Sequence, residues 1–246
     1  MHLLRSIMTG VLNNLMKAEQ LLFSQGFGTR SECRNLIFSE KLTFNNEVIE
    51  SPETEISIEN GQEFTVNGEV WPYYEKAILV MNKPIHYECS TKPQSHPSVN
   101  SLLPSPLRTR GLQPVGRLDE DTTGLLLFTD NGQLNHYLTH PKRKVQKVYK
   151  VGLKYPATPT FIEKLLKGVV LKDSPDVIRA DRCDLVDSLT IHLAVSQGKY
   201  HQVKRMIAAA SNRVVSLHRI QFGKLSLPLQ LESGKWLWVT NASEIL

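Results

Sequence analysis

The segment GRLDEDTTG at residues 116–124 places three consecutive carboxylates next to Arg117 and at the start of the apolar run GLLLF. Its glycines and threonines predict a tight turn that would deliver Asp119 to the mouth of a buried strand. A carboxylate in that position is half-buried, so it needs a cation or hydrogen-bond donors to stay charged. An aspartate that is ionised, fixed and partly desolvated can act as a nucleophile or as a base.

A cation for Asp119 is available far along the chain, in the segment GKYHQVKRM at residues 198–206. This segment predicts a helix that carries Lys204 and Arg205. If the helix packs near the turn, the Lys204 ammonium would lie within about 4–6 Å of Asp119 and would lower the pKa of that carboxyl. The residues alone leave two interpretations open: a catalytic pair, or a buried ion pair that merely ties a helix to a sheet.

The elements that must position these residues fall into two groups along the chain. Residues 16–72 predict two short helices followed by three strand-like runs, and the segment at 26–31 is expected to end the first helix and cap the second. Residues 73–246 mix strands and helices without a regular β–α–β alternation. We therefore expect an α+β fold: a mixed, largely antiparallel sheet in a domain at 73–246, a small N-terminal α/β domain at 16–72, and a disordered leader at 1–15.

The composition argues against several classes of protein. The longest apolar runs hold five residues, far short of the roughly 20 that cross a bilayer, so no membrane association is expected. Cys33, Cys89 and Cys183 are widely separated, which predicts neither disulfides nor a zinc site and makes a reducing cytoplasm the default. Neither a dinucleotide fingerprint nor a phosphate-binding loop is present, so we expect no cofactor and no metal, and a monomer is the default.

The charge is unevenly distributed along the chain. The formal net charge is +5, yet residues 1–72 hold 5 Lys and Arg against 10 Asp and Glu, which leaves 24 against 14 for residues 73–246. A cationic surface of that size is typical of proteins that face a polyanion. Nucleic acid is the commonest such partner.

Four motifs occur together: NKP followed by CST, then GRLDEDTTGLLLFTDNG, then KVYKV, and finally GKYHQVKRM followed by VVSLHRIQFG. In this combination the chain resembles the pseudouridine synthases that modify ribosomal RNA. It most resembles the branch that carries an N-terminal S4 RNA-binding domain and acts on small-subunit ribosomal RNA. The resemblance runs from about residue 16 to residue 246, and its S4-like part covers roughly residues 16–62.

The resemblance implies roles for individual residues. Asp119 would be the catalytic residue and Lys204 would pair with it. Tyr149 of KVYKV would stack on the target base or contact it, and Arg117 would help to hold the flipped nucleotide or fill its place. Arg205 is counted with these substrate-binding residues. The implied reaction, isomerisation of uridine, needs no cofactor.

Further cations are candidates for contacts with ribosomal RNA or a ribosomal subunit assembly intermediate, the partners that the resemblance implies. In the S4-like part they are Lys17, Arg30, Arg34 and Lys41; near Tyr149 they are Lys142, Arg143, Lys144 and Lys147. Cations interleaved with an aromatic residue are typical of RNA-binding surfaces. Because the N-terminal part carries ten acidic residues, we expect it to contact RNA weakly.

Three residues of the motifs fall outside these roles. His86 stands where the family usually has a glycine, two residues after NKP, and a histidine reaches the backbone angles of glycine only at a cost. Glu120 and Asp121 have no catalytic role in this interpretation, and Asp121 is expected to cap the turn.

Three alternatives stay open at the level of sequence. The chain could act on large-subunit ribosomal RNA, or it could be a non-catalytic RNA-binding ribosome assembly factor that keeps the fold. Asp119, Glu120 and Asp121 could also be magnesium ligands of a nuclease, although no further acidic cluster completes the usual oxygen cage.

Overall fold

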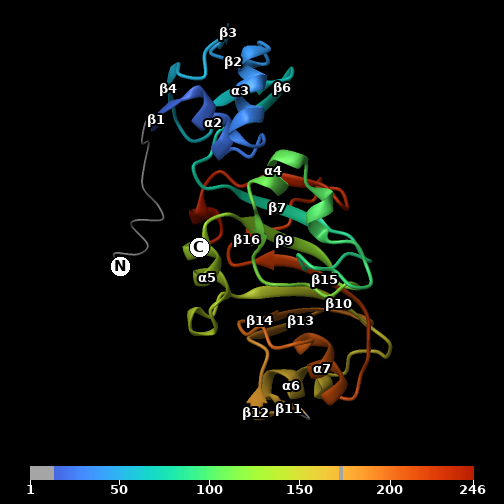
Figure 1. The fold of residues 1–246 in the computed structure, drawn as a ribbon. Helices are drawn as coiled ribbons and strands as arrows, with labels where there is room; N and C mark the ends of the chain where they lie inside the picture. Colours follow the sequence, from blue (N-terminus) through green and yellow to red (C-terminus); the bar gives the residue numbers. More distant parts are fainter. Residues whose placement is uncertain (1–13, 172–173) are drawn as a thin grey trace.

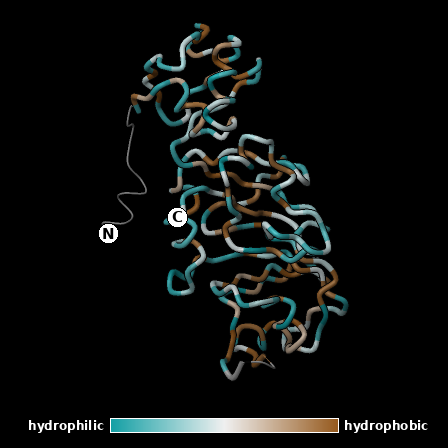
Figure 2. The backbone as a smooth tube through the Cα atoms, in the orientation of Figure 1, coloured by the Kyte–Doolittle hydropathy of each residue, from teal (hydrophilic) through white to brown (hydrophobic). Residues whose placement is uncertain are grey.

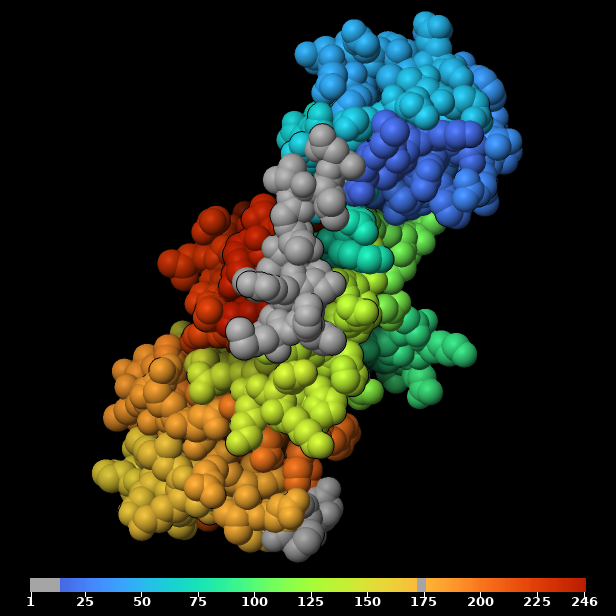
Figure 3. Space-filling view, turned by 90° about the vertical axis from the view of Figure 1, so that its left-hand side faces the viewer, coloured from blue at the N-terminus to red at the C-terminus, as the bar shows by residue number. Residues whose placement is uncertain are grey.

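The structure is a computed structural model that describes residues 14–171 and 174–246. Figure 1 shows three parts along its length: an N-terminal module of residues 14–72, a nine-stranded sheet, and a layer that contains α6 (Pro159–Lys167) and α7 (Gln202–Ala209). In the space-filling view of Figure 3 the N-terminal module forms a lobe at one end. We propose that this lobe is a domain of its own, with the boundary between residues 72 and 73.

The N-terminal module contains two helices and two small sheets. Its elements are β1 (Asn14–Lys17), α2 (Ala18–Ser24), α3 (Arg30–Phe38), β2 (Leu42–Phe44), β3 (Glu47–Val48), β4 (Glu55–Ile58), β5 (Glu63–Val66) and β6 (Glu69–Pro72). β1 pairs with β4, and the other strands form an antiparallel sheet in the order β3-β2-β5-β6. Asn-Asn and Asn-Gly turns with positive φ join β2 to β3 and β5 to β6, as tight hairpins require.

Two expectations for this module can be compared with the structure. Thr29 caps α3 in a reciprocal capping box with Glu32, so the predicted start of the second helix is confirmed. The expected leader extends too far, because Asn14 and Leu15 already pair with β4. This pairing is a backbone contact with a strand some 40 residues away, which the local sequence does not indicate. Residues 1–13 of the expected leader lie outside the described part of the chain.

A nine-stranded sheet forms the centre of the molecule. Its strands are β7 (Ile78–Lys83), β8 (Gln113–Pro114), β9 (Thr123–Thr129), β10 (Lys147–Leu153), β13 (Arg182–Asp187), β14 (Thr190–Val195), β15 (Val214–Phe222), β16 (Leu225–Ser226) and β17 (Trp236–Trp238). They lie in the order β13-β14-β10-β15-β9-β7-β17, with β16 added to β15 and β8 to β9. The β9–β15 pair is parallel and the others are antiparallel, which confirms the expected mixed sheet.

Short helices and loops cover the sheet. The remaining elements are η1 (Val99–Leu102), α4 (Ser105–Thr109), α5 (Gly132–Thr139), η2 (Pro141–Arg143), β11 (Val169–Leu171), β12 (Ser174–Ile178) and η3 (Ala242–Glu244). β7 and β9 are buried on both faces: Val80 and Leu127 belong to the core beneath α5, while Leu79 and Leu126 belong to the core beneath η1 and α4. Figure 2 shows hydrophobic segments along the strands and at the α6 end.

One helix begins later in the chain than expected. The helix predicted over GKYHQVKRM begins only at Gln202, because His201 adopts a left-handed conformation with φ 47°. α4 lies in the proline-rich segment before β8, where its Leu107 is buried in the core. Across the two described ranges, no helix has both the length and the apolar character that a membrane span requires.

The register of the sheet brings the two halves of the candidate site together. Arg219 of β15 stands opposite Gly124 of β9 on one side and opposite Tyr149 of β10 on the other. Gly124 has φ 100°, and a Cβ at this position would lie 2.3 Å from the Arg219 carbonyl oxygen, so only glycine allows this close approach. The turn before Gly124 is therefore held two strands away from Tyr149.

The N-terminal module is fastened to the sheet through Arg110, which ends α4. The Arg110 side chain is 4% exposed and forms an ion pair with Asp130 at 2.5 Å. Its guanidinium also donates to the Gln25 side chain at 2.5 Å and to the carbonyl oxygens of Tyr74 and Glu75 at 2.6 and 2.9 Å. One buried cation therefore ties α2, the segment after β6 and the end of β9 together.

Candidate active site

The loop that leads into β9 forms the predicted tight turn. The amide of Thr122 donates to the Asp119 carbonyl oxygen at 3.1 Å. Lys83, at the end of β7, supports this turn from a fully buried position: its ammonium donates at 3.0 Å to the carbonyl oxygens of Pro84, Asp119 and Thr122, and at 3.4 Å to that of Glu120. Burial lowers the pKa of Lys83 because it disfavours the charged form. The carbonyl oxygens accept hydrogen bonds from the ammonium and so stabilise its charge.

Asp119 meets the cation that the sequence predicts. Lys204 Nζ lies 3.0 Å from Asp119 Oδ2, which confirms the pairing. His201 Nε2 lies 3.3 Å from the other carboxylate oxygen, Oδ1. The Asp119 side chain is 29% exposed, so it is fixed by its neighbours and still accessible to a substrate.

Asp121 differs from expectation. Rather than serving only the turn, its Oδ1 accepts a hydrogen bond from Lys204 Nζ at 2.6 Å, so one ammonium contacts two carboxylates. Burial alone would raise the pKa of Asp121, but the hydrogen bond and the charge of Lys204 outweigh burial and hold this pKa below its usual value. In the same way, burial would lower the pKa of Lys204, but its bonds to Asp121 and Asp119 outweigh it and raise this pKa. Lys204 therefore stays cationic at neutral pH.

An open cleft lies at this point of the sheet. Its lining includes Arg117, Asp119, Tyr149 and Lys204, so the structure brings together four of the five residues assigned to catalysis and substrate binding.

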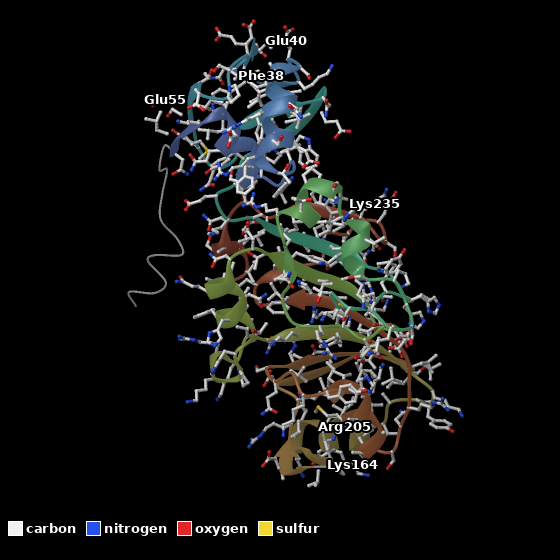
Figure 4. The ribbon with its side chains drawn as sticks, in the orientation of Figure 1. Phe38, Glu40, Glu55, Lys164, Arg205 and Lys235 are labelled. Carbon is white, nitrogen blue, oxygen red and sulfur yellow. The ribbon has the colours of Figure 1, made fainter. Side chains whose placement is uncertain are left out.

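Arg205 lies outside this lining. Its guanidinium donates to the Tyr200 carbonyl oxygen at 3.0 Å, so it supports the segment before α7. Figure 4 shows Arg205 at the same end of the molecule as Lys164 and far from Phe38, which marks the N-terminal module.

Two residues that hold the site in place, His201 and Lys83, have no assigned role in the sequence motifs. The rings of Tyr200 and His201 stack with centroids 3.8 Å apart, and His201 reaches Asp119 through its left-handed backbone, which no spacing reveals. Lys83 did carry a signal: it follows the apolar run AILVM in a strand that has to be buried, and a buried lysine requires hydrogen-bond acceptors.

The cations proposed for RNA contacts in the N-terminal module are largely engaged with carboxylates. Lys17 pairs with Glu53 at 2.5 Å, while Arg30, at 2.8 Å, and Arg34 both pair with Glu19. Lys41 is exposed. A role in RNA binding for these four residues stays a prediction, and RNA phosphates would have to compete with the carboxylates.

The cations near Tyr149 separate into two kinds. Lys142, Arg143 and Lys144 are exposed on η2 and directly after it, and we call this segment the basic loop. Lys147 is half-buried, with its ammonium 5.3 Å from the centroid of the Phe222 ring. Burial and, to a lesser degree, the nearby Arg219 lower the pKa of Lys147 to about 8. The basic loop is therefore better placed than Lys147 to contact phosphates.

The position of Lys204 disfavours Mg²⁺ binding by the carboxylates of the turn. The Lys204 ammonium contacts both Asp119 and Asp121, and so takes the place that a cation between them would need. Among the described residues, the group of three potential metal ligands that gathers nearby consists of His86, His96 and Glu120 and does not include Asp119.

Known proteins share the sequence features of this sheet and cleft. The family model described as RNA pseudouridylate synthase matches residues 77–209, which is more than half of the chain. The chain therefore belongs to this family and is a pseudouridine synthase, an isomerase.

Several named proteins and a solved structure are similar to most of this chain. Ribosomal small subunit pseudouridine synthase A of Yersinia pestis is 34% identical to this chain over 92% of this chain and 95% of its own length. The protein of the same name from Escherichia coli strain K12 is 39% identical over 66% of this chain and 70% of its own length. A crystal structure of a pseudouridylate synthase has a TM-score of 0.65 and 32% identity, and the match covers 94% of this chain and 98% of that one.

Proposed function

We propose that this chain converts a uridine of small-subunit ribosomal RNA into pseudouridine, with Asp119 as the catalytic carboxylate. The observation that carries the role of Asp119 is its place in the open cleft, 3.0 Å from the Lys204 ammonium and still 29% exposed. The names of the relatives from Yersinia pestis and Escherichia coli support the choice of the small subunit.

We further propose the oligomeric state, the location and the RNA partner with which the chain acts. The chain acts as a monomer in the cytoplasm, on ribosomal RNA or a subunit assembly intermediate, and needs no cofactor. Residues 16–72 act as an S4-like domain that orients the RNA weakly, since this part of the chain is acidic overall.

The reaction exchanges one bond of the uridine for another. The glycosidic bond from N1 to C1′ breaks, the uracil rotates, and C5 bonds to C1′; the C5 proton is released and N1 gains a proton. Asp119 can attack C1′, add to C6, or abstract a proton from the sugar, and each route uses the carboxylate as an anion. Lys204 and His201 hold the two oxygens of this carboxylate in one orientation in the cleft.

The uridine has to leave its stack to reach Asp119, at a cost of a few kcal/mol that is smaller in a loop or a distorted helix. Tyr149 lines the cleft, where its ring can stack on the extruded base, and the exposed Arg117 can fill the space that the base vacates. Phosphate contacts of the basic loop help to offset the cost of extrusion.

The catalytic assignment is tested by tritium release from RNA that carries [5-³H]uridine, because the C5 proton is lost only when the new bond forms. We expect Asp119→Asn to lower the rate by roughly a thousandfold or more. Asp121→Asn is the matched control: it removes the neighbouring carboxylate that shares Lys204 and is expected to lower the rate far less. Wild-type turnover by Asp119→Asn would remove the assignment.

The substrate is tested with the same assay on separate small-subunit and large-subunit ribosomal RNAs from cells that lack this protein. We expect release from the small-subunit RNA. Release from the large-subunit RNA alone would replace the proposed substrate but leave the chemistry intact. Binding without release from either RNA would favour the non-catalytic assembly factor.

A further inference from the structure

A second cluster of reactive side chains lies beside the catalytic turn. It consists of His86 in the loop after β7, His96 further along the same loop, and Glu120 of the turn. His86 Nδ1 and His96 Nε2 lie 3.5 and 4.0 Å from the same oxygen, Glu120 Oε2. The two imidazole rings stack with centroids 5.6 Å apart, and the three potential ligand atoms lie within 4.8 Å of one another.

The backbone holds these side chains in place. The His86 amide donates to the Glu120 carbonyl oxygen at 2.8 Å, and His86 adopts the left-handed conformation, with φ 63°, that costs energy for a residue with a side chain. His96 lies in a loop organised by Glu88, whose carboxylate accepts hydrogen bonds from the amides of Ser95 and His96 at 2.8 and 2.9 Å. The cluster is therefore pre-organised on two fixed segments.

Hydrogen bonding does not account for the arrangement. Both distances to Glu120 Oε2 are longer than an ordinary hydrogen bond, so the nitrogen atoms face the carboxylate without being satisfied by it. In a tetrahedral zinc site, ligand atoms about 2.0–2.2 Å from the ion lie roughly 3.4 Å from one another. The two distances to Glu120 Oε2 therefore need an adjustment of well under 1 Å to accommodate an ion, and the two histidine nitrogens, which lie within 4.8 Å of each other, need at most about 1.4 Å.

We propose that His86, His96 and Glu120 bind a Zn²⁺ ion, with water completing the coordination. Two imidazoles and one carboxylate form a ligand set that zinc accepts, whereas Mg²⁺ prefers oxygen ligands throughout. The His86 side chain is 66% exposed, so an ion can enter from solvent.

A fourth residue supports this assignment. Glu88 Oε1 lies 3.9 Å from His96 Nδ1, the ring nitrogen that does not face Glu120. A carboxylate behind a ligating imidazole fixes the ring orientation and the tautomer in many metal sites. At 3.9 Å the contact is longer than a hydrogen bond, so Glu88 would have to approach Nδ1 by somewhat under 1 Å to fix the tautomer that leaves Nε2 of His96 free for the ion.

The zinc site is distinct from the catalytic carboxylates. Lys204 contacts Asp119 and Asp121, whereas the Glu120 side chain between them points to the two histidines. A bound ion would join the loop at 84–96 to the catalytic turn. Because the two sites use different side chains, Zn²⁺ binding can be measured directly, and its outcome does not depend on the proposed reaction.

The test uses the full chain without a polyhistidine tag, freed of metal by a chelator and titrated with Zn²⁺ against a chromogenic chelator. We expect wild type to bind one equivalent of Zn²⁺, with no competition from an excess of Mg²⁺. The double variant His86→Gly/His96→Ala is expected to lose this equivalent, and glycine at residue 86 keeps the left-handed backbone without strain. Glu120→Gln is expected to weaken binding by roughly tenfold or more, as losses around metal sites do.

A matched control is available at the end of α5. His136 and His140 also have neighbouring rings, with centroids 5.0 Å apart, but among the described residues no carboxylate gathers with them. The double variant His136→Ala/His140→Ala is expected to keep the equivalent, and Zn²⁺ is expected to raise the melting temperature of this control but not of the His86/His96 variant. Wild type that binds no Zn²⁺, or binding that survives in the His86/His96 variant, overturns the proposal.

Discussion

At the residue scale, the site depends on one ammonium that two carboxylates share. Lys204 contacts Asp119 at 3.0 Å and Asp121 at 2.6 Å, and without it two negative charges would face each other across the mouth of the cleft. We expect Lys204→Met to lower kcat by roughly a hundredfold, as the loss of one pre-organised donor does. Arg205→Met, on the same helix but outside the cleft lining, is expected to stay within a few-fold of wild type. Equal losses in the tritium-release assay would contradict this division of roles.

Lys147 gives a residue-scale prediction about stability. Burial and the neighbouring Arg219 lower the pKa of its folded form to about 8, against 10.5 for the ordinary side chain. Between pH 8 and pH 10.5 the unfolded chain binds a proton that the folded chain does not, so the free energy of unfolding rises with pH in this window. Below pH 8 Lys147 is charged in both states, and the full cost of burying its charge lowers the free energy of unfolding. Lys147→Met is therefore expected to raise the free energy of unfolding at pH 7.

Urea unfolding of wild type and variant at neutral and alkaline pH measures this effect. The difference between Lys147→Met and wild type is expected to shrink as the pH rises through the window above pH 8. Lys150→Met is the control, because Lys150 is exposed on the same strand. If both variants change with pH in the same way, burial of Lys147 is not the cause.

At the scale of elements, β7 and β9 position the catalytic turn through a single buried side chain. Lys83 donates to three carbonyl oxygens of residues 119–122 and to that of Pro84. We expect Lys83→Met to lower the free energy of unfolding by about 1–3 kcal/mol, because the substitution leaves a buried carbonyl oxygen without a hydrogen-bond donor. We also expect kcat to fall by roughly tenfold or more with little change in KM, because a small displacement of Asp119 is costly.

Leu134→Ala separates loss of stability from loss of position. Leu134 is buried in α5, away from the cleft lining, and its truncation is expected to cost about 2–5 kcal/mol. Both variants are assayed for tritium release at a temperature where each is folded. If Leu134→Ala loses as much kcat as Lys83→Met, destabilisation alone explains the effect and Lys83 is not a positioning residue.

Elements defined by local patterns could be predicted from the sequence, whereas most contacts between distant segments could not; the Asp119–Lys204 pair is an exception because the family resemblance implies it. β9, β10 and the capping box at Thr29 follow from apolar runs and capping residues, and the sequence motifs also indicated the pairing of Asp119 with Lys204. The second partner of Lys204, Asp121, depends on how α7 approaches the turn. His201 depends on a left-handed backbone angle, which only the folded chain fixes. The same reason explains why the sequence did not indicate that Glu120 faces His86 and His96.

At the scale of the whole molecule, an acidic N-terminal part is joined to a basic remainder. Residues 1–72 carry 5 Lys and Arg against 10 Asp and Glu, and Glu19 engages two of the cations of the module. RNA is therefore expected to be attracted mainly by the larger part, while the module determines how the RNA is oriented. This division requires a fixed connection between the two parts, and Arg110 supplies it.

The connection through Arg110 leads to a prediction about the entire chain. Arg110→Ala leaves Asp130 without its cationic partner, leaves the Tyr74 carbonyl oxygen with Gln25 Nε2 as a donor at 3.3 Å, and removes the Arg110 donor from the Glu75 carbonyl oxygen. Breaking a buried pair in this way typically costs about 3–5 kcal/mol. We expect faster proteolysis of the segment between β6 and β7 and a higher KM for ribosomal RNA. We expect kcat to change little, because the cleft does not include the module.

Gly26→Ala tests the same contact from the side of the module. A Cβ at Gly26 would lie 2.1 Å from the Pro106 carbonyl oxygen and 2.8 Å from the Arg110 amide, so the methyl group has to push α2 away from α4. It is therefore expected to raise proteolysis and KM as Arg110→Ala does. Arg108→Ala, an exposed arginine on the same helix, serves as the control and is expected to match wild type. Unchanged cleavage in both Arg110→Ala and Gly26→Ala would show that the module is held by contacts other than this buried cation.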